Sequence, residues 1–290
     1  MNAASAEYGI LEKNLPAMNM ISEIKPAARL LTLFLLLYLV AACGRADLSA
    51  NFGDFSGTFV LYEQSSGRYT IVGKNRANER FSPMSTFKIP NSIIALETGV
   101  VADTGQVLSW DTLSYPVESW WPETWQGQHT LSSAMRYSVV PVYRTLATKI
   151  GNERMQTYIG QFGYGNGDIS SGIDRFWLNG SLKISAKEQV DFLRRFYQDE
   201  LQVATATTDA VKGILVREKN DDYRLSYKTG AGSLGNGKKS AIGWLVGYVE
   251  KQDDVYFFAL NIEGESFAEI LAPRLEITQA MLRDLDIITP

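Results

Sequence analysis

The sequence predicts an α+β protein in which both ends of the chain build one antiparallel sheet, flanked by helices, with a helical lobe inserted between. Strand patterns occur at residues 57–72 and again at 223–262, whereas apolar residues between these stretches recur at helical spacing. Strands that follow one another through short turns pair antiparallel. Because the two groups of strands enclose the helices in sequence, we expect a single sheet closed by both chain ends.

The strands are recognised as runs of β-branched and aromatic residues between turn residues. The first two, at residues 57–64 and 68–72, are joined by Ser65-Ser66-Gly67, which is a hairpin turn. The other strand patterns lie at residues 223–228, 241–249 and 255–262, and a closing helix is expected at about 272–285.

The helical part begins near Ser85. Pro83 suits a first helical turn, whereas Pro90 does not suit a helix interior. We therefore expect a short separate turn at Ser85 that leads into a longer helix ending near Thr98. The other expected helices cover residues 131–150, 155–162, a stretch that opens at the capping box Ser185-Ala186-Lys187-Glu188 and runs through Phe196, and 208–215.

The composition excludes several kinds of site. The formal net charge is −4 and no run of Lys and Arg occurs, which argues against a nucleic-acid partner. Cys43 is the single cysteine, so an intramolecular disulfide and a cysteine metal site are excluded. With one histidine, His129, a histidine-rich zinc site is excluded as well, and we expect no metal.

Residues 1–46 are expected to be an export signal, and residues 47–290 a single domain. Lys25 and Arg29 precede an apolar stretch at 30–40 that is short for a membrane span and of the right length for a signal peptide. Small residues then lead to Cys43, as in a lipoprotein signal, although cleavage after Ala46 and a permanent anchor remain open. The expected location is the periplasm, with membrane contact only through a lipid on Cys43.

The most informative motif is Ser85-Thr86-Phe87-Lys88. A serine nucleophile needs a base, and His129 lies far away in sequence in an expected loop. On a helix, residues three apart share a face, so the Lys88 amine can reach the Ser85 hydroxyl. The apolar residues that follow would bury Lys88, and burial favours a neutral amine that can accept a proton.

Two further motifs follow in order, Ser138-Val139-Val140 and Lys228-Thr229-Gly230. Together with S-x-x-K they form the signature of penicillin-recognising serine enzymes. Ser138 and Lys228 would face each other across a cleft and relay a proton to the lactam nitrogen as it leaves. Val140 stands where S-D-N enzymes carry an amide, which argues against a class A β-lactamase and gives an apolar wall beside Lys88.

From about residue 55 to 290 the chain resembles a class D serine β-lactamase of the oxacillinase type. Besides the three motifs it carries Tyr164-Gly165-Asn166, the Y-G-N box of that class, and Trp177 within Phe176-Trp177-Leu178. The resemblance implies the fold shared by serine β-lactamases and penicillin-binding transpeptidases. Tyr164 and Asn166 would brace the site. Trp120, Trp121 and Trp125 belong either to the core or to a cleft rim.

The resemblance implies a role for each catalytic residue. Ser85 would attack the lactam carbonyl, and Lys88 would carry carbon dioxide as a carbamate, which serves as general base in both steps. The alternative is an unmodified Lys88 acting as base. Trp177 has an indole N–H that could hydrogen-bond the carbamate. No dissociable cofactor is implied.

The substrate contacts are implied in the same way. Lys228 and Thr229 would bind the substrate carboxylate, with Arg274 as a second anchor, and Gly230 would allow close approach of the ligand to the backbone. The backbone N–H groups of Ser85 and Ala231 would form the oxyanion hole. Ala231 replaces the aromatic residue of many relatives, which opens that side of the cleft.

The expected function is hydrolysis of the β-lactam ring through an acyl-serine intermediate, which gives antibiotic resistance. Two alternatives use the same residues: a β-lactam sensor that is acylated without turnover, and a cell-wall transpeptidase or carboxypeptidase. The chain has one short apolar segment and no zinc-protease motif, unlike such sensors, so the hydrolase is favoured. The sequence leaves monomer and homodimer open.

Overall fold

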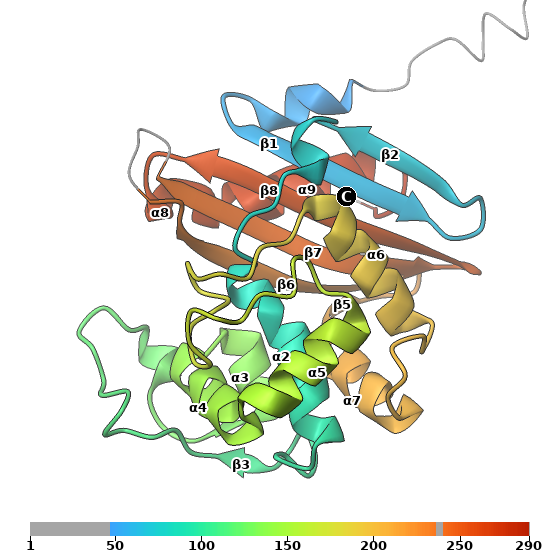
Figure 1. Ribbon diagram of the computed structural model, residues 1–290. Coiled ribbons are helices and arrows are strands. Elements are labelled where there is room, and N and C mark those ends of the chain that lie inside the picture. Colours follow the sequence, from blue (N-terminus) through green and yellow to red (C-terminus); the bar gives the residue numbers. More distant parts are fainter. Residues whose placement is uncertain (1–46, 236–239, 290) are drawn as a thin grey trace, which may run out of the picture. The chain divides into compact units, whose positions relative to one another are not determined.

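The sheet of this protein is antiparallel and six-stranded, with the order β2-β1-β8-β7-β6-β5. The computed structural model describes residues 47–235 and 240–289, and residues from 48 onward form one compact unit (Figure 1). β1, from the beginning of this unit, pairs with β8, from its end, so the predicted α+β architecture is confirmed. The strands are β1 (Ser56–Glu63), β2 (Arg68–Val72), β5 (Val216–Lys219), β6 (Tyr223–Ser233), β7 (Ala241–Lys251) and β8 (Asp254–Gly264).

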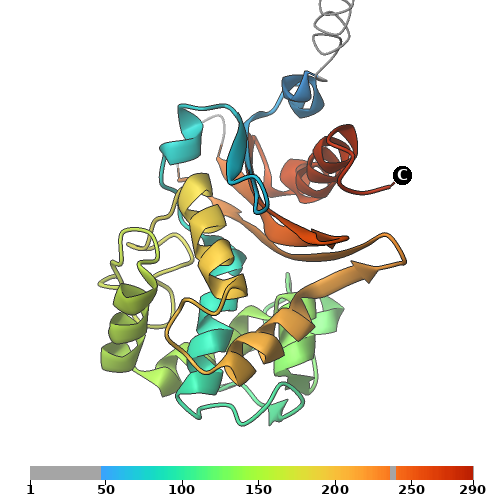
Figure 2. The same ribbon diagram turned by 90° about the vertical axis from the view of Figure 1, so that its right-hand side faces the viewer.

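The two faces of the sheet bury different layers (Figures 1 and 2). Alternate residues of β7 point to opposite faces, so Leu245 packs with the C-terminal helix α9 and Trp244 packs with the helical lobe. β7 is buried on both faces for this reason. The helices α8 (Phe267–Leu271) and α9 (Pro273–Asp284) cover one face, and α6 (Ala186–Tyr197) lies against the other.

The helical lobe follows β2 and returns to the sheet at β5. The capping box expected at Ser185 is present at the start of α6. The Ser185 hydroxyl accepts from the Glu188 N–H, and the Glu188 carboxylate accepts from the Ser185 N–H. The lobe contains α2 (Lys88–Glu97), α3 (Leu131–Tyr137), α4 (Val140–Ile150), α5 (Asn152–Phe162), α7 (Thr205–Leu215) and the two-stranded β3 (Val107–Leu108) and β4 (His129–Thr130). Short 3-10 turns are η1 (Leu48–Phe52), η2 (Arg76–Asn78), η3 (Met84–Phe87) and η4 (Glu123–Trp125).

The expected single helix at 131–150 is wrong. The chain breaks at Ser138, whose φ of 60° is left-handed, and a second helix begins at Val140. Pro141 is the physical reason, because a proline lacks the N–H that a continuous helix would need there and its ring would clash with the preceding turn. The turn expected at Ser85 is confirmed as η3, and Pro90 lies in the first turn of α2, where no amide is needed.

Two further sequence expectations change. His129 is not in a loop: it is buried in β4, where its ring nitrogens contact Trp125 O and Ser133 Oγ, each at 3.2 Å. The expected export signal with Cys43 lies outside the described residues. Among the residues that the structure describes, none of the helices combines the length and apolar character that crossing a membrane requires.

Candidate active site

The structure brings Ser85 and Lys88 together at the junction of η3 and α2. Lys88 Nζ lies 2.7 Å from Ser85 Oγ, within hydrogen-bond distance. The Ser85 side chain is partly exposed, whereas Lys88 is fully buried beneath it. A nucleophile that solvent can reach is therefore in direct contact with an amine that solvent cannot reach.

Burial governs the charge of Lys88. It lowers the pKa of this amine to about 7, because a charged ammonium loses its hydration in an apolar interior. The centre of the Tyr143 ring lies 5.2 Å from Nζ. Within residues 47–235 and 240–289 no carboxylate pairs with Lys88, so near neutral pH a large fraction of this amine is unprotonated.

Trp177 lies beside this pair with an unused hydrogen-bond donor. Its indole is stacked on Phe87, with ring centres 5.3 Å apart, and its backbone carbonyl accepts from the Met84 N–H at 3.0 Å. The indole Nε1 is fully buried, and no partner for it occurs among the described residues. A buried N–H without a partner costs free energy, so we expect an acceptor to bind at this position.

Ser138 ends α3 in a conformation that is rare for a residue other than glycine. Its φ and ψ are 60° and 39°, and its partly exposed side chain precedes Val139 and Val140. A left-handed serine costs about 1–2 kcal/mol relative to an ordinary helical one. Such strain is retained where the side chain must face a particular direction.

Lys228 enters the site from β6, and it too is buried. Burial lowers its pKa well below the usual value, and the charges of Lys88, Arg217 and Arg274 lower it further. Its ammonium donates to Thr229 O at 2.8 Å, and in the described part of the chain no hydrogen bond joins it to Ser138. The effect of the Lys88 charge on its pKa places Lys228 near the Ser85–Lys88 pair.

Gly230 is packed against the nucleophile turn itself. A Cβ added at this position would lie 3.0 Å from Pro83 O and 3.1 Å from Thr86 Cγ2. The glycine of K-T-G thus allows β6 to approach η3 closely, whereas the sequence suggested only a close approach of ligand. This packing of Gly230 against Pro83 and Thr86 fixes the position of Ser85 relative to Lys228 on β6.

Known proteins share this arrangement of sequence and fold. The penicillin-binding protein transpeptidase domain family matches residues 57–284. Beta-lactamase OXA-48 of Klebsiella pneumoniae is 42% identical over 232 residues, which cover 80% of this chain and 84% of that protein. The solved structure of FUS-1 (OXA-85), a class D β-lactamase from Fusobacterium nucleatum subsp. polymorphum, has a TM-score of 0.78 at 36% identity and covers 83% of this chain and 98% of its own.

This chain belongs to the class D β-lactamase family. A regulatory protein, BlaR1 of Bacillus licheniformis, is also similar, at 37% identity over 77% of this chain and 36% of that protein. The similarity to OXA-48 and to FUS-1 confirms the resemblance to class D that the sequence indicated.

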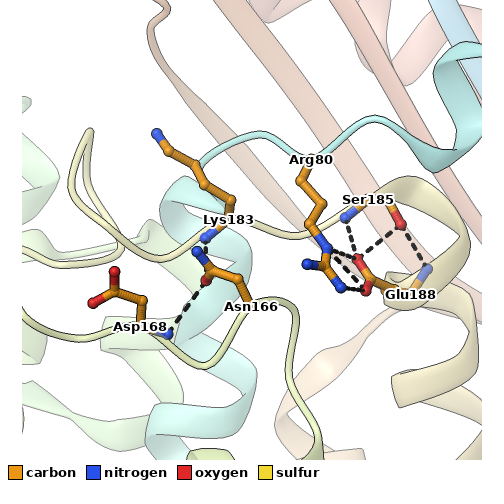
Figure 3. Close-up of polar contacts among 6 residues, drawn as sticks. All are labelled: Arg80, Asn166, Asp168, Lys183, Ser185 and Glu188. Carbon is orange, nitrogen blue, oxygen red and sulfur yellow. Dashed lines mark hydrogen bonds and ion pairs between the residues drawn. The ribbon is translucent and has the colours of Figure 1, made fainter.

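In this class D chain, Asn166 of the Y-G-N box binds both ends of the segment 168–183, in which Trp177 lies; Figure 3 shows these contacts of Asn166. The Asn166 side-chain carbonyl accepts the Lys183 N–H at 2.9 Å and the Asp168 N–H at 3.3 Å. Figure 3 also shows the ion pair of Arg80 with Glu188, whose carboxylate completes the capping box of α6 with Ser185. Tyr164 donates to Gln189, and Gln189 donates to the Thr86 hydroxyl at 2.8 Å, next to Ser85.

Arg274 opens α9 and contacts the K-T-G strand. Its Nη1 donates to Gly230 O at 2.6 Å, and its buried Nε has no partner in the described ranges. Burial lowers its pKa to about 10, so it stays charged at neutral pH. Ala231 follows Gly230 on the same strand and is partly exposed.

The tryptophans before Ser138 divide between core and surface. Trp121 and Trp125 are buried, whereas Trp120 is 64% exposed. The Trp125 Nε1 donates to Tyr137 O at 2.9 Å, so this cluster supports the end of α3. Sequence reasoning missed Arg217, because an arginine outside any motif carries no signal until the fold places it near Lys228.

Proposed function

We propose that this protein hydrolyses the β-lactam ring of penicillin-type antibiotics through an acyl-enzyme on Ser85 and thereby confers resistance. Its membership of the class D β-lactamases supports this function. The observation that carries it is the 2.7 Å contact between the Ser85 hydroxyl and the buried Lys88 amine. A serine and a lysine in this contact are a nucleophile and the base that it needs.

In the proposed acylation, Ser85 Oγ attacks the lactam carbonyl carbon and its proton passes to the base at Lys88. The C–N bond of the ring then breaks, and the nitrogen takes a proton relayed through Ser138 from Lys228. The proton held by the base at Lys88 then passes back to Lys228, which restores both groups. Water gives a proton to the freed base and attacks the ester, and the Ser85 oxygen takes that proton as the opened acid leaves. One water is consumed, because its oxygen enters the new carboxylate and its protons balance the ring nitrogen and the acid.

The substrate would be held by groups that surround this step. Lys228 and Thr229 from β6 would bind its carboxylate. Arg274 would add a guanidinium whose Nε has no partner in the described part of the chain. The backbone N–H groups of Ser85 and Ala231 would stabilise the oxyanion. Val140 would form an apolar wall beside the lysine.

We infer further that Lys88 carries carbon dioxide as a carbamate. Two observations fit this group: the amine has a pKa of about 7, and the buried Trp177 Nε1 has no acceptor within residues 47–235 and 240–289. A carbamate supplies negative charge and a general base at this position. Trp177 would hold it through its indole N–H, and the surrounding apolar residues would exclude competing water.

We also propose that the protein is exported to the periplasm, either cleaved after Ala46 or lipidated at Cys43. The support is the sequence pattern of residues 1–46.

One mass-spectrometric experiment on the exported protein tests the acyl-enzyme on Ser85 and the export proposal together. After reaction with a slowly hydrolysed β-lactam, the adduct is expected on the peptide that contains Ser85, and Ser85→Ala is expected to gain none. The same measurement gives the mature N-terminus, which is expected at a lipidated Cys43 or directly after Ala46. An adduct on another residue contradicts the mechanism, and an intact Met1 or Met18 contradicts export.

A further inference from the structure

Arg217 joins the two parts of the chain that carry Ser138 and Lys228. It is the second residue of β5 and is partly buried. Its Nη1 donates to Ile214 O at 3.3 Å and Val216 O at 3.5 Å, both close in sequence. Its Nη2 donates to Met135 O at 3.4 Å, across 82 residues of sequence.

The carbonyl of Met135 is available because α3 ends abnormally. In a continuing helix it would accept the Val139 N–H, four residues on. Here both the Ser138 and the Val139 N–H groups point to Ala134 O, because Ser138 is left-handed. Arg217 supplies a donor to the carbonyl that this turn leaves free, and a cation at a helix C-terminus also stabilises the helix dipole.

On its other side, Arg217 contacts the strand of Lys228. Its guanidinium carbon lies 5.9 Å from the centre of the Tyr227 ring, and Tyr227 directly precedes Lys228 on β6. No carboxylate pairs with Arg217 in the described part of the chain, so its charge is not neutralised locally. A single side chain thus spans the end of α3 and the K-T-G strand.

We propose that Arg217 is a positioning residue of the reaction, which holds the end of α3, and therefore Ser138, against the strand that carries Lys228. The inference rests on the proposed function, since the proton relay between Ser138 and Lys228 is the step that this placement serves. Arg217 acts through these two residues and does not itself touch substrate.

The charge of Arg217 gives this role a pH signature. Lys228 faces Lys88 from α2, Arg217 from β5 and Arg274 from α9, and these cations add to burial in lowering its pKa. Arg217 itself faces Tyr227, Arg136 and Tyr143. Removing the Arg217 charge therefore raises the pKa of Lys228, and the protonated form needed for the relay persists to higher pH.

The test is the rate of Ser85 acylation in single-turnover experiments with a chromogenic cephalosporin from pH 6 to pH 10. Arg217→Gln is expected to slow acylation near pH 7 by roughly tenfold to a hundredfold, because Ser138 is displaced. The alkaline limb of its pH–rate profile is expected at higher pH than that of the wild type, because one of the cations that lower the pKa of Lys228 is gone. Arg217→Lys keeps the charge, so the alkaline limb of its pH–rate profile is expected to coincide with that of the wild type. Arg136→Gln removes a nearby charge that lies on α3 itself and whose side chain makes no hydrogen bond among the described residues. It is the matched control and is expected to acylate near the wild-type rate.

An Arg217→Gln variant with the wild-type rate and limb would overturn the proposal. A merely structural role would also overturn it. That role would appear as a lower melting temperature and slower acylation in Arg217→Gln, with the alkaline limb of its pH–rate profile unmoved, and as equally slow acylation in Arg217→Lys. Because acylation is measured without turnover, a wild-type protein that is acylated but never released contradicts the proposed hydrolysis while leaving the role of Arg217 testable.

Discussion

At the scale of single residues, the charge state of Lys88 determines both the chemistry of the site and the stability of the fold.

The S-x-x-K spacing predicted contact between Ser85 and Lys88, because the two residues are close in sequence. The unpaired indole N–H of Trp177 and the bridge made by Arg217 could not be predicted from spacing, because both depend on segments that meet only in the folded chain.

Replacing Lys88 with methionine is expected to stabilise the protein, most strongly at low pH. The folded amine loses its proton near pH 7, whereas in the unfolded chain its pKa is near the ordinary 10.5. Between these values the unfolded chain binds more protons, so wild-type stability rises with pH. Below pH 7 the buried charge costs roughly 3–5 kcal/mol, and Lys88→Met removes this cost.

Urea unfolding of both proteins at pH 6 and pH 9, without bicarbonate, measures the effect. The stability advantage of Lys88→Met is expected to shrink between the two pH values. An advantage that is equal at both would mean that Lys88 does not have the low pKa on which the mechanism depends.

At the scale of elements, the close approach of β6 to η3 aligns the motifs. The Lys228-Thr229-Gly230 strand was recognised from its residues, but its glycine was assigned to ligand approach, whereas the structure places Pro83 O beside it. The break at Ser138 was also missed, although Pro141 is a physical signal for it in the sequence.

Gly230→Ala is expected to push β6 away from η3. The new Cβ would lie 3.0 Å from Pro83 O and 3.1 Å from Thr86 Cγ2, which is closer than an ordinary van der Waals contact. We expect a loss of about 1–3 kcal/mol in stability and slower acylation. Gly213→Ala in α7 is the matched control, since a Cβ there meets nothing within 4 Å, and it is expected to stabilise by about 0.5–1 kcal/mol. Thermal unfolding compares them, and a Gly230→Ala variant as stable and as rapidly acylated as the wild type would refute this account of the contact.

At the scale of the whole described unit, the site depends on pairing between distant parts of the chain. β1 and β8 are paired in register, for example Val60 with Ala259, which closes the sheet from both ends. This closure was predictable, because hydrophobic patterns identify strands and consecutive hairpins identify neighbours. The contacts that hold the end of α3 were not, because they rest on side chains such as Arg217 and Trp125 that belong to no motif.

The central claim is that Ser85 is acylated and then released by a base that survives acylation. Counting the moles of chromogenic cephalosporin consumed per mole of protein, with and without added bicarbonate, tests it most directly. We expect many turnovers, none for Ser85→Ala, and for Trp177→Phe a turnover that depends more strongly on bicarbonate, because the ring is kept and its N–H donor is lost. A single burst equal to the amount of protein, unchanged by bicarbonate, would contradict the account and indicate a sensor or a transpeptidase-like protein.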